Sequence, residues 1–227
     1  MDKNPLVSLE QLGQSIWTDF ISRAMIEGGG LQQFILNDGV TGVTSNPSIF
    51  QKAIAESHDY DDEIQKLADK GRTVEEIYEI LTVEDIQHTA DILRPTYNRL
   101  QGSDGYISLE VSPKLAHVTD GTIDEARRLW KKVGRPNVMI KVPGTEAGIP
   151  AIQQLIEDGI NVNITLLFGL PRYRQVIEAY ISGLESRISR RQPIKDVSSV
   201  ASFFLSRIDV LVDPLLGDIV QTGTPDP

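Results

Sequence analysis

Lys141 is a cation in the middle of an apolar run, residues 137–143 (NVMIKVP), which has the length and composition of a buried strand. Burying an ammonium without a partner is costly, so burial favours the neutral amine. A neutral lysine attacks carbonyl carbons and forms a Schiff base. The run alone also fits a lysine that reaches water from a strand end or pairs with a carboxylate. Lys141 is therefore a candidate nucleophile whose role depends on its neighbours.

Polar side chains stand near the carboxyl ends of the other apolar runs. In chain order they are Asp19, Asn46, Glu110, Asn163, Thr165, Ser202, Ser206 and Arg207. Asn163 and Thr165 are two residues apart and therefore point to the same face of their strand. An amine with carboxylates, amides and hydroxyls supplies a nucleophile, proton carriers and groups that bind sugar hydroxyls. This set of groups is suited to carbonyl chemistry.

Each of these residues also has an ordinary structural explanation. Asp19 could cap the following helix, and Asn46 could form a turn. Glu110 could lie at the surface or neutralise the buried lysine. Thr165 suits any strand, and Arg207 could be a surface cation. The combination at successive strand ends is harder to explain in this way than any single residue.

Six short apolar runs alternate with amphipathic helical stretches. We expect strands at about 15–20, 42–45, 105–111, 138–142, 161–167 and 197–205. Helices are expected at about 31–36, 73–100 with a second start near Thr82, 121–133, 148–158 and 171–190, the last being the longest without interruption. The stretch from 47 to 102 is long for one crossover and is expected to hold several helices. Repeated alternation predicts parallel strands with right-handed crossovers.

Two folds suit parallel strands that are apolar on both faces: a (β/α)8 barrel and a doubly wound sheet. The glycine-rich phosphate-binding patterns of doubly wound folds are missing from the sequence. Polar residues at nearly every strand end favour the barrel instead, because its strand ends converge on one face. We therefore predict an α/β barrel with about six of the usual eight strands, forming one domain over residues 1–227.

Composition excludes several classes of function. The 227 residues carry a formal net charge of -10, which disfavours a nucleic-acid surface, and contain no cysteine, which excludes disulfides and thiolate chemistry. The absence of cysteine also fits a cytoplasmic protein, and no stretch is long and apolar enough to span a membrane. His58, His88 and His117 are widely spaced and form no metal-ligand motif, so no metal is expected.

Four segments together resemble the transaldolases. They are residues 42–48 (GVTSNPS), 108–113 (SLEVSP), 140–145 (IKVPGT) and 161–166 (NVNITL), and the likeness extends over essentially the whole chain. The start of the chain, with IWTD at 16–19, is similar to a longer bacterial branch whose members are sometimes fused to glucose-6-phosphate isomerase. The resemblance implies a barrel enzyme of the class I aldolase type, acting in the non-oxidative pentose phosphate pathway without a cofactor. Its members move a dihydroxyacetone unit from sedoheptulose 7-phosphate to glyceraldehyde 3-phosphate.

The resemblance also implies a role for each candidate residue. Lys141 would form the Schiff base, and Asp19 would be the acid and base for cleaving and forming the carbon–carbon bond. Glu110 and Thr165 would handle the water of imine formation and hydrolysis. The substrate would be held by Asn46 and Asn163 at its hydroxyls and by Ser202 and Arg207 at its phosphate.

The sequence departs from the family near its end. Two further strands with their helices do not fit between residue 208 and residue 227, since one such unit takes roughly 30 residues. We expect a fragment of a longer protein, whose activity as a lone chain is weak or absent. The alternatives are a chain that closes its open sheet edges by pairing with a partner or by domain swapping, and a shortened product with little stability. Residues 223–227 are expected to form a loop. A class I sugar-phosphate aldolase and a non-catalytic relative remain the alternative functions.

Overall fold

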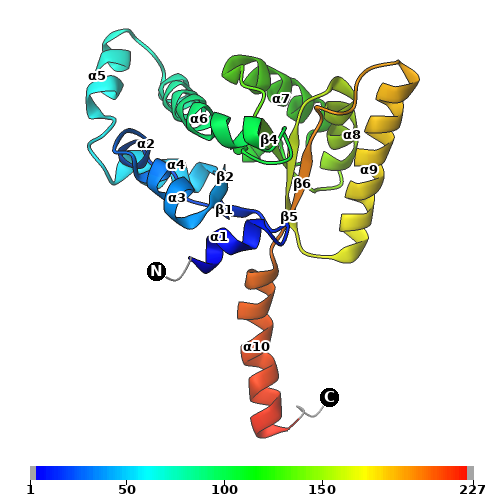
Figure 1. The fold of residues 1–227 in the computed structure, drawn as a ribbon. Coiled ribbons are helices and arrows are strands. Elements are labelled where there is room, and N and C mark those ends of the chain that lie inside the picture. Colours follow the sequence, from blue (N-terminus) through cyan, green and yellow to red (C-terminus); the bar gives the residue numbers. More distant parts are fainter. Residues whose placement is uncertain (1–3, 224–227) are drawn as a thin grey trace.

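The computed structural model describes residues 4–223, and six parallel strands form its single sheet (Figure 1). The strands follow one another in space in chain order. This order, with a helix after each strand, is that of a barrel wall and not of a doubly wound sheet, whose order reverses. The structure therefore confirms an α/β fold with six strands of a partial barrel. The strands are β1 (Ile16–Thr18), β2 (Val40–Thr44), β3 (Ile107–Glu110), β4 (Val138–Pro143), β5 (Val162–Leu167) and β6 (Ser199–Phe203).

The middle strands are buried on both faces, as expected of a parallel sheet that is covered by helices. All six residues of β4 are buried, and its register places Lys141 between Glu110 of β3 and Asn163 of β5. The edge strands β1 and β6 have no fully buried residue. The candidate lysine therefore lies on a strand that is buried along its whole length.

Helices cover the outer side of the curled sheet, except for the last one, which projects away from it. They are α1 (Pro5–Glu10), α2 (Arg23–Glu27), α3 (Gly30–Asp38), α4 (Pro47–Ala55), α5 (Asp61–Asp69), α6 (Val74–Arg99), α7 (Thr119–Val133), α8 (Gly148–Asp158), α9 (Leu170–Ser189) and α10 (Leu205–Thr222). The apolar side chains between helices and sheet form one continuous core. None of the helices in the described range is long and apolar enough to cross a bilayer.

Helix α6 corrects two expectations. The capping box at its start is present: the Thr73 hydroxyl accepts from the backbone of Glu76, whose carboxylate accepts from the backbone of Thr73. The expected second start near Thr82 is wrong, because the Thr82 hydroxyl bonds back to Tyr78 and the helix continues. With 26 residues α6, and not α9 with 20, is the longer helix. The expectation of several helices between 47 and 102 is confirmed.

A close approach fixes the first strand. The indole of Trp17 lies over Gly42 of β2, where a Cβ would come within 2.3 Å of the ring, and its Nε1 donates to Asp104 at 3.0 Å. No other residue leaves room for the ring. This contact anchors β1 and thereby the position of Asp19, which follows it.

The end of the chain also differs from expectation. The predicted strand over 197–205 stops at Phe203, and Leu205 begins α10, an 18-residue helix that projects away from the body (Figure 1). Pro214 lies inside this helix, although proline lacks a backbone donor and is usually avoided there. Gly223 ends this helix, and residues 224–227 of the expected loop lie outside the described residues.

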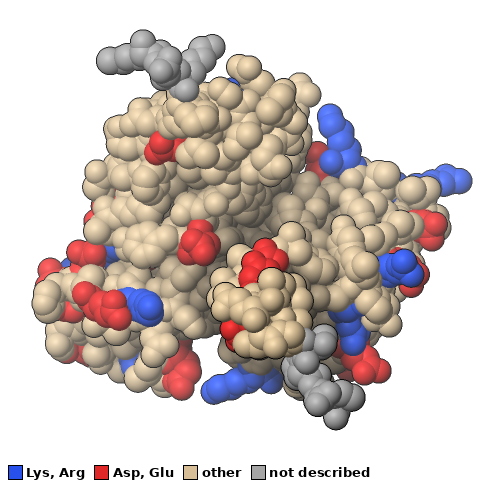
Figure 2. All heavy atoms as spheres, turned by 90° about the horizontal axis from the view of Figure 1, so that it is seen from below, with Lys and Arg blue, Asp and Glu red and all other residues tan. Residues whose placement is uncertain are grey.

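Seen from below, along α10, the surface is hollowed beside the helix and carries few charges across its middle (Figure 2). The carboxyl ends of the strands lie on this side, because β6 runs directly into α10. Active sites of barrels are found at that end.

Candidate active site

Lys141 lies on β4, in the middle of the sheet that forms the barrel wall, and is 6% exposed. Its amine donates to the backbone carbonyl of Ser45 at 3.2 Å and lies 3.4 Å from a carboxylate oxygen of Glu110. The expectation of a lysine that reaches water from the strand end is wrong, whereas the pairing with a carboxylate is confirmed. A paired, desolvated amine in a narrow polar site fits a nucleophile as well as a structural ion pair.

Glu110 has an environment that suits a proton carrier. Burial raises the pKa of Glu110 above its ordinary value, while the positive charge of Lys141 acts in the opposite direction. A carboxyl with a raised pKa holds a proton for a larger part of the time near neutral pH. Glu110 could therefore donate a proton to a leaving hydroxyl beside the amine.

The side chains of Ser108 on β3, Asn163 on β5 and Ser202 on β6 form one row of hydrogen bonds. The Asn163 amide donates to the hydroxyl of Ser108 at 2.9 Å, and its carbonyl oxygen accepts from the hydroxyl of Ser202 at 2.8 Å. Because Ser108, Asn163 and Ser202 hold one another, the amide is fixed in orientation. Sequence reasoning missed Ser108, although it lies two residues before Glu110 and so faces the same side.

Thr165 faces the same side as Asn163, as predicted from its spacing. Its hydroxyl is buried and has no hydrogen-bond partner among the described residues. Such an unsatisfied group is costly unless a water or a ligand group pairs with it. The next residue, Leu166, has a left-handed backbone (φ 63°) at a bulge in the pairing with β6, and its side chain is turned to solvent. The strand therefore ends its regular course directly after Thr165.

Asn46 and Asp19 stand at two further strand ends. Asn46 caps α4, because its side-chain oxygen accepts from the backbone of Ile49 at 3.0 Å, which leaves the amide nitrogen for a ligand. Asp19 is exposed after β1, three strands from the lysine. The suggestion that Asp19 caps a helix is wrong, since Ser22 caps α2.

Arg207 is not at a strand end. It lies in the first turn of α10, is exposed, and its guanidinium stacks on the ring of Phe204 at 4.7 Å. The strand prediction over 197–205 placed it too close to the sheet. Its assignment to a phosphate site stays a prediction.

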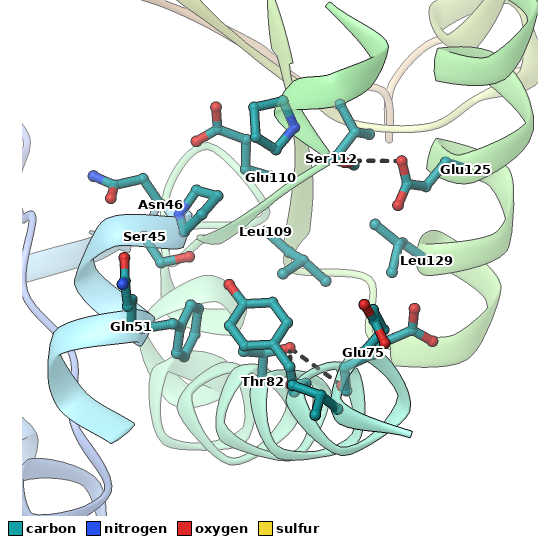
Figure 3. Close-up of a pocket in the computed structure, with 17 residues that line it drawn as sticks. Ser45, Asn46, Gln51, Glu75, Thr82, Leu109, Glu110, Ser112, Glu125 and Leu129 are labelled. Atoms are coloured by element: carbon teal, nitrogen blue, oxygen red, sulfur yellow. Dashed lines mark hydrogen bonds between the residues drawn. The ribbon is translucent and has the colours of Figure 1, made fainter. Parts of the chain in front are cut away.

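A cavity of about 480 Å³ borders this site on the side of α4, α6 and α7 (Figure 3). Ser45 and Glu110, the two residues that contact the Lys141 amine, both line it, whereas Lys141 does not. Figure 3 shows Ser45 and Asn46 on the side opposite Glu125 and Leu129. The cavity thus gives space beside both partners of the amine.

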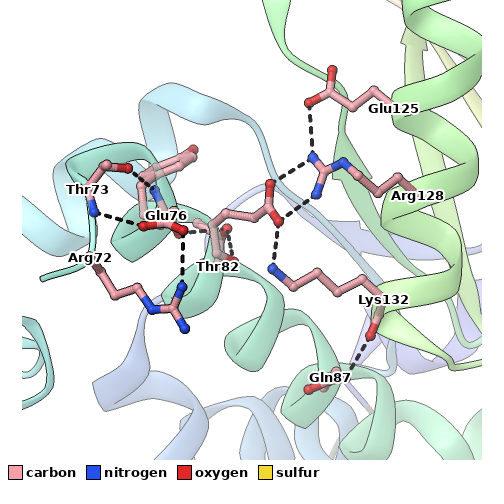
Figure 4. A network of polar contacts seen from close by, with 10 residues as sticks. Arg72, Thr73, Glu76, Thr82, Gln87, Glu125, Arg128 and Lys132 are labelled. Atoms are coloured by element: carbon pink, nitrogen blue, oxygen red, sulfur yellow. Dashed lines mark hydrogen bonds and ion pairs between the residues drawn. The ribbon is translucent and has the colours of Figure 1, made fainter. Parts of the chain in front are cut away.

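The far wall of the cavity is fixed by ion pairs between α6 and α7 (Figure 4). Glu79 accepts from Arg128 at 2.6 and 2.7 Å and from Lys132 at 2.6 Å. The hydrogen bonds from Arg128, with help from Lys132 and despite partial burial, lower the pKa of Glu79 to about 2. This carboxylate therefore stays charged throughout the neutral range.

These ion pairs predict acid sensitivity of the wall. Folding lowers the pKa of Glu79, so the charged carboxylate stabilises the folded state. This contribution to the free energy of unfolding is complete above about pH 4.5 and is lost as the pH falls towards about 2. We expect Glu79→Gln to lower the free energy of unfolding at neutral pH by on the order of 1 kcal/mol, since water screens a partly exposed pair. The difference in the free energy of unfolding between Glu79→Gln and the wild type should become smaller at acidic pH. Urea unfolding between about pH 6 and about pH 3 measures it, and a constant difference would contradict the assignment.

Comparison with known proteins then identifies the family. The sequence model described as Transaldolase/Fructose-6-phosphate aldolase matches residues 16–224. The chain belongs to this family. Among curated relatives, Transaldolase 2 of Nostoc sp. is 48% identical over 223 residues, which cover 98% of this chain and 58% of the relative. The transaldolase of Thiobacillus denitrificans is 48% identical over 211 residues (93% and 59%), and that of Mycobacterium marinum is 44% identical over 218 (96% and 58%).

The chain therefore spans under two thirds of the length of these transaldolases. The likeness includes all six strands and both walls of the cavity, since the family match begins at β1. It confirms the family that the four sequence motifs indicated. The roles of the individual residues are not tested by it.

Proposed function

We propose that the chain performs the Schiff-base chemistry of a transaldolase, transferring a dihydroxyacetone unit from sedoheptulose 7-phosphate to glyceraldehyde 3-phosphate. The observation that carries this proposal is the buried amine of Lys141 with Glu110 at 3.4 Å. An amine in this setting attacks the substrate's ketone carbon, and loss of water gives an iminium. Glu110 donates the proton that turns the hydroxyl of the adduct into that water, and the free hydroxyl of Thr165 holds the water.

The iminium is the electron sink for the second step. A base removes the proton from the hydroxyl two carbons away, the carbon–carbon bond breaks, and an aldehyde leaves. Asp19 is the base in this proposal, and its exposed position after β1 allows it to meet a substrate that enters from the carboxyl-end face. The enamine that remains attacks the acceptor aldehyde, and water then releases the product from Lys141.

Amide and hydroxyl groups hold the donor sugar in this scheme. Asn163 is oriented by Ser108 and Ser202, and the Asn46 nitrogen is not used by its cap, so both amides have capacity for sugar hydroxyls. Arg207 supplies a charge for the phosphate, as the nearest cation in the sequence after β6. Sugar phosphates are thus the proposed partners, in the cytoplasm, and association of copies through the edges of β1 and β6 stays a prediction.

A class I aldolase is the second candidate, because the matching family includes fructose-6-phosphate aldolases. The two activities differ in their need for an acceptor. A transaldolase should consume fructose 6-phosphate at least about tenfold faster when erythrose 4-phosphate is added, since the enamine otherwise stays on the lysine. Steady release of free dihydroxyacetone, unchanged by the acceptor, would indicate the aldolase. A folded chain with neither activity would support the non-catalytic relative.

A further inference from the structure

The turn after β3 begins directly behind Glu110 and consists of Val111 and Ser112. The N–H of Val111 donates to the backbone carbonyl of Lys141 at 3.1 Å, which ties this residue to β4. The 3-10 helix η1 (Pro113–Leu115) follows, and its first residue is a proline, which has no N–H to donate. The N–H of Ser112 is therefore the one backbone donor of the turn that is still available to hold it.

A side chain of α7 binds this donor. A carboxylate oxygen of Glu125 accepts from the N–H of Ser112 at 3.0 Å (Figure 3). Glu125 lies three residues after Thr122 and four before Leu129, both of which are buried on the inner face of α7. A carboxylate beside a buried face is costly unless its oxygens are paired. The hydrogen bond to Ser112 supplies such a partner.

Glu125 is itself held in place by the ion pairs of the cavity wall. Arg128 lies 3.7 Å from its second oxygen and donates two hydrogen bonds to Glu79 of α6. The wall formed by α6 and α7 thus fixes Glu125, and Glu125 fixes the turn after β3. Because β3 is flanked by β2 and β4, this turn does not lie at an open edge of the sheet.

The turn borders the cavity described above. Glu110, Ser112 and Glu125 all line this cavity of about 480 Å³. On that side no close-packed side chains hold the end of β3, so the contact between Ser112 and Glu125 is what fixes it there. A movement of the turn would carry Glu110 with it. Misplacement of a reacting group by about 1 Å is enough to lower a rate about a hundredfold.

We propose that Glu125 is a positioning residue: by holding the N–H of Ser112, it keeps the carboxylate of Glu110 beside the amine of Lys141. This proposal rests on the Schiff-base function proposed above, in which Glu110 delivers a proton to the adduct on Lys141. Glu125 acts through the backbone of the turn and not through contact with the amine.

Three variants separate positioning from a general effect on α7. Glu125→Ala removes the acceptor, whereas Glu125→Gln retains an oxygen that accepts from Ser112. Asp124→Ala is the matched control, because it removes a carboxylate from the adjacent, exposed position of the helix. The measurement is the initial rate at which borohydride captures dihydroxyacetone on Lys141 from fructose 6-phosphate. We expect at least about a tenfold loss in Glu125→Ala and rates within about threefold of the wild type in the other two.

A double-mutant cycle shows whether Glu125 acts through Glu110. In a Glu110→Gln background, Glu125→Ala should change the capture rate less than about twofold, because the group that it positions no longer carries a proton to transfer. The same tenfold loss in both backgrounds would mean that Glu125 only stabilises the fold. That result, or an unchanged rate in Glu125→Ala alone, would overturn the proposal.

A measurement without substrate keeps this proposal separate from the proposed function. The ¹³C resonance of the Glu110 carboxyl group and the hydrogen exchange of the Ser112 N–H are followed by NMR. Glu125→Ala should shift that resonance and speed that exchange at least about tenfold, whereas Glu125→Gln and Asp124→Ala should change neither. If these changes occur but the wild type captures no dihydroxyacetone, the Schiff-base function fails and the positioning of Glu110 stands. An unmoved Glu110 resonance in Glu125→Ala would overturn the positioning, whatever the capture experiment shows.

Discussion

Replacement of Asp85 by asparagine is expected to lower the free energy of unfolding by about 2–3 kcal/mol, because the buried guanidinium of Arg23 loses its most deeply buried counter-charge and keeps only the partly exposed Glu63 and Glu84. Asp85 of α6 is completely buried. One of its oxygens accepts from Arg23 at 3.0 and 2.9 Å, and the other accepts from the Tyr60 hydroxyl at 2.7 Å. Arg23 belongs to α2 and Tyr60 precedes α5, so one carboxylate joins three helices.

The matched control is Asp91→Asn. Asp91 also accepts two hydrogen bonds from one arginine, Arg135, but this pair lies at the surface. Exposed pairs contribute up to about 1 kcal/mol, so the control should be nearly neutral. Urea unfolding followed by circular dichroism measures both variants. Equal losses for Asp85→Asn and Asp91→Asn would show that the buried network does not hold the helices together.

Lys141→Arg is expected to remove transferase activity by at least about a thousandfold, because a guanidinium stays protonated and does not form a Schiff base. Arginine retains the positive charge beside Glu110, so the ion pair and the fold should persist. The measurement is the rate of donor consumption in the presence of an acceptor, together with urea unfolding. A variant that is stable and inactive supports a chemical role for the amine.

Lys131→Arg is the control for general effects of this substitution. Lys131 is exposed on α7, away from the site, and its variant should keep the wild-type rate. A rate for Lys141→Arg within about tenfold of that control would mean that Lys141 is only the structural partner of Glu110.

The wall that holds Lys141 could be predicted from sequence because it depends on local patterns. Apolar runs of strand length and helix caps can be recognised from residues that are neighbours in the sequence. The run around Lys141 forms the buried strand that its composition indicated. The partnership with Glu110 followed from the alignment of parallel strands, whose carboxyl ends meet on one face. These features need no knowledge of distant contacts.

Other features depend on contacts that no local pattern reveals. The amine of Lys141 donates to the backbone carbonyl of Ser45, and such a backbone contact cannot be inferred from the residue type. The Arg23–Asp85 network joins residues that are far apart in the sequence. The end of β6 was misjudged because apolar residues continue from Phe203 into Leu205, and a continuous apolar run fits a strand and a buried helix equally well. The same error placed Arg207 near a strand end, whereas it lies in the first turn of α10.

The most direct measurement of the central claim is chemical capture of the amine. The protein is incubated with fructose 6-phosphate, reduced with borohydride, digested and mapped by mass spectrometry, with Lys141→Arg treated in parallel. A Schiff base at this residue predicts a dihydroxyacetone adduct on the peptide that contains Lys141 in the wild type, and none in the variant. A folded wild-type chain that carries no adduct, or that carries it on another lysine, would contradict the account.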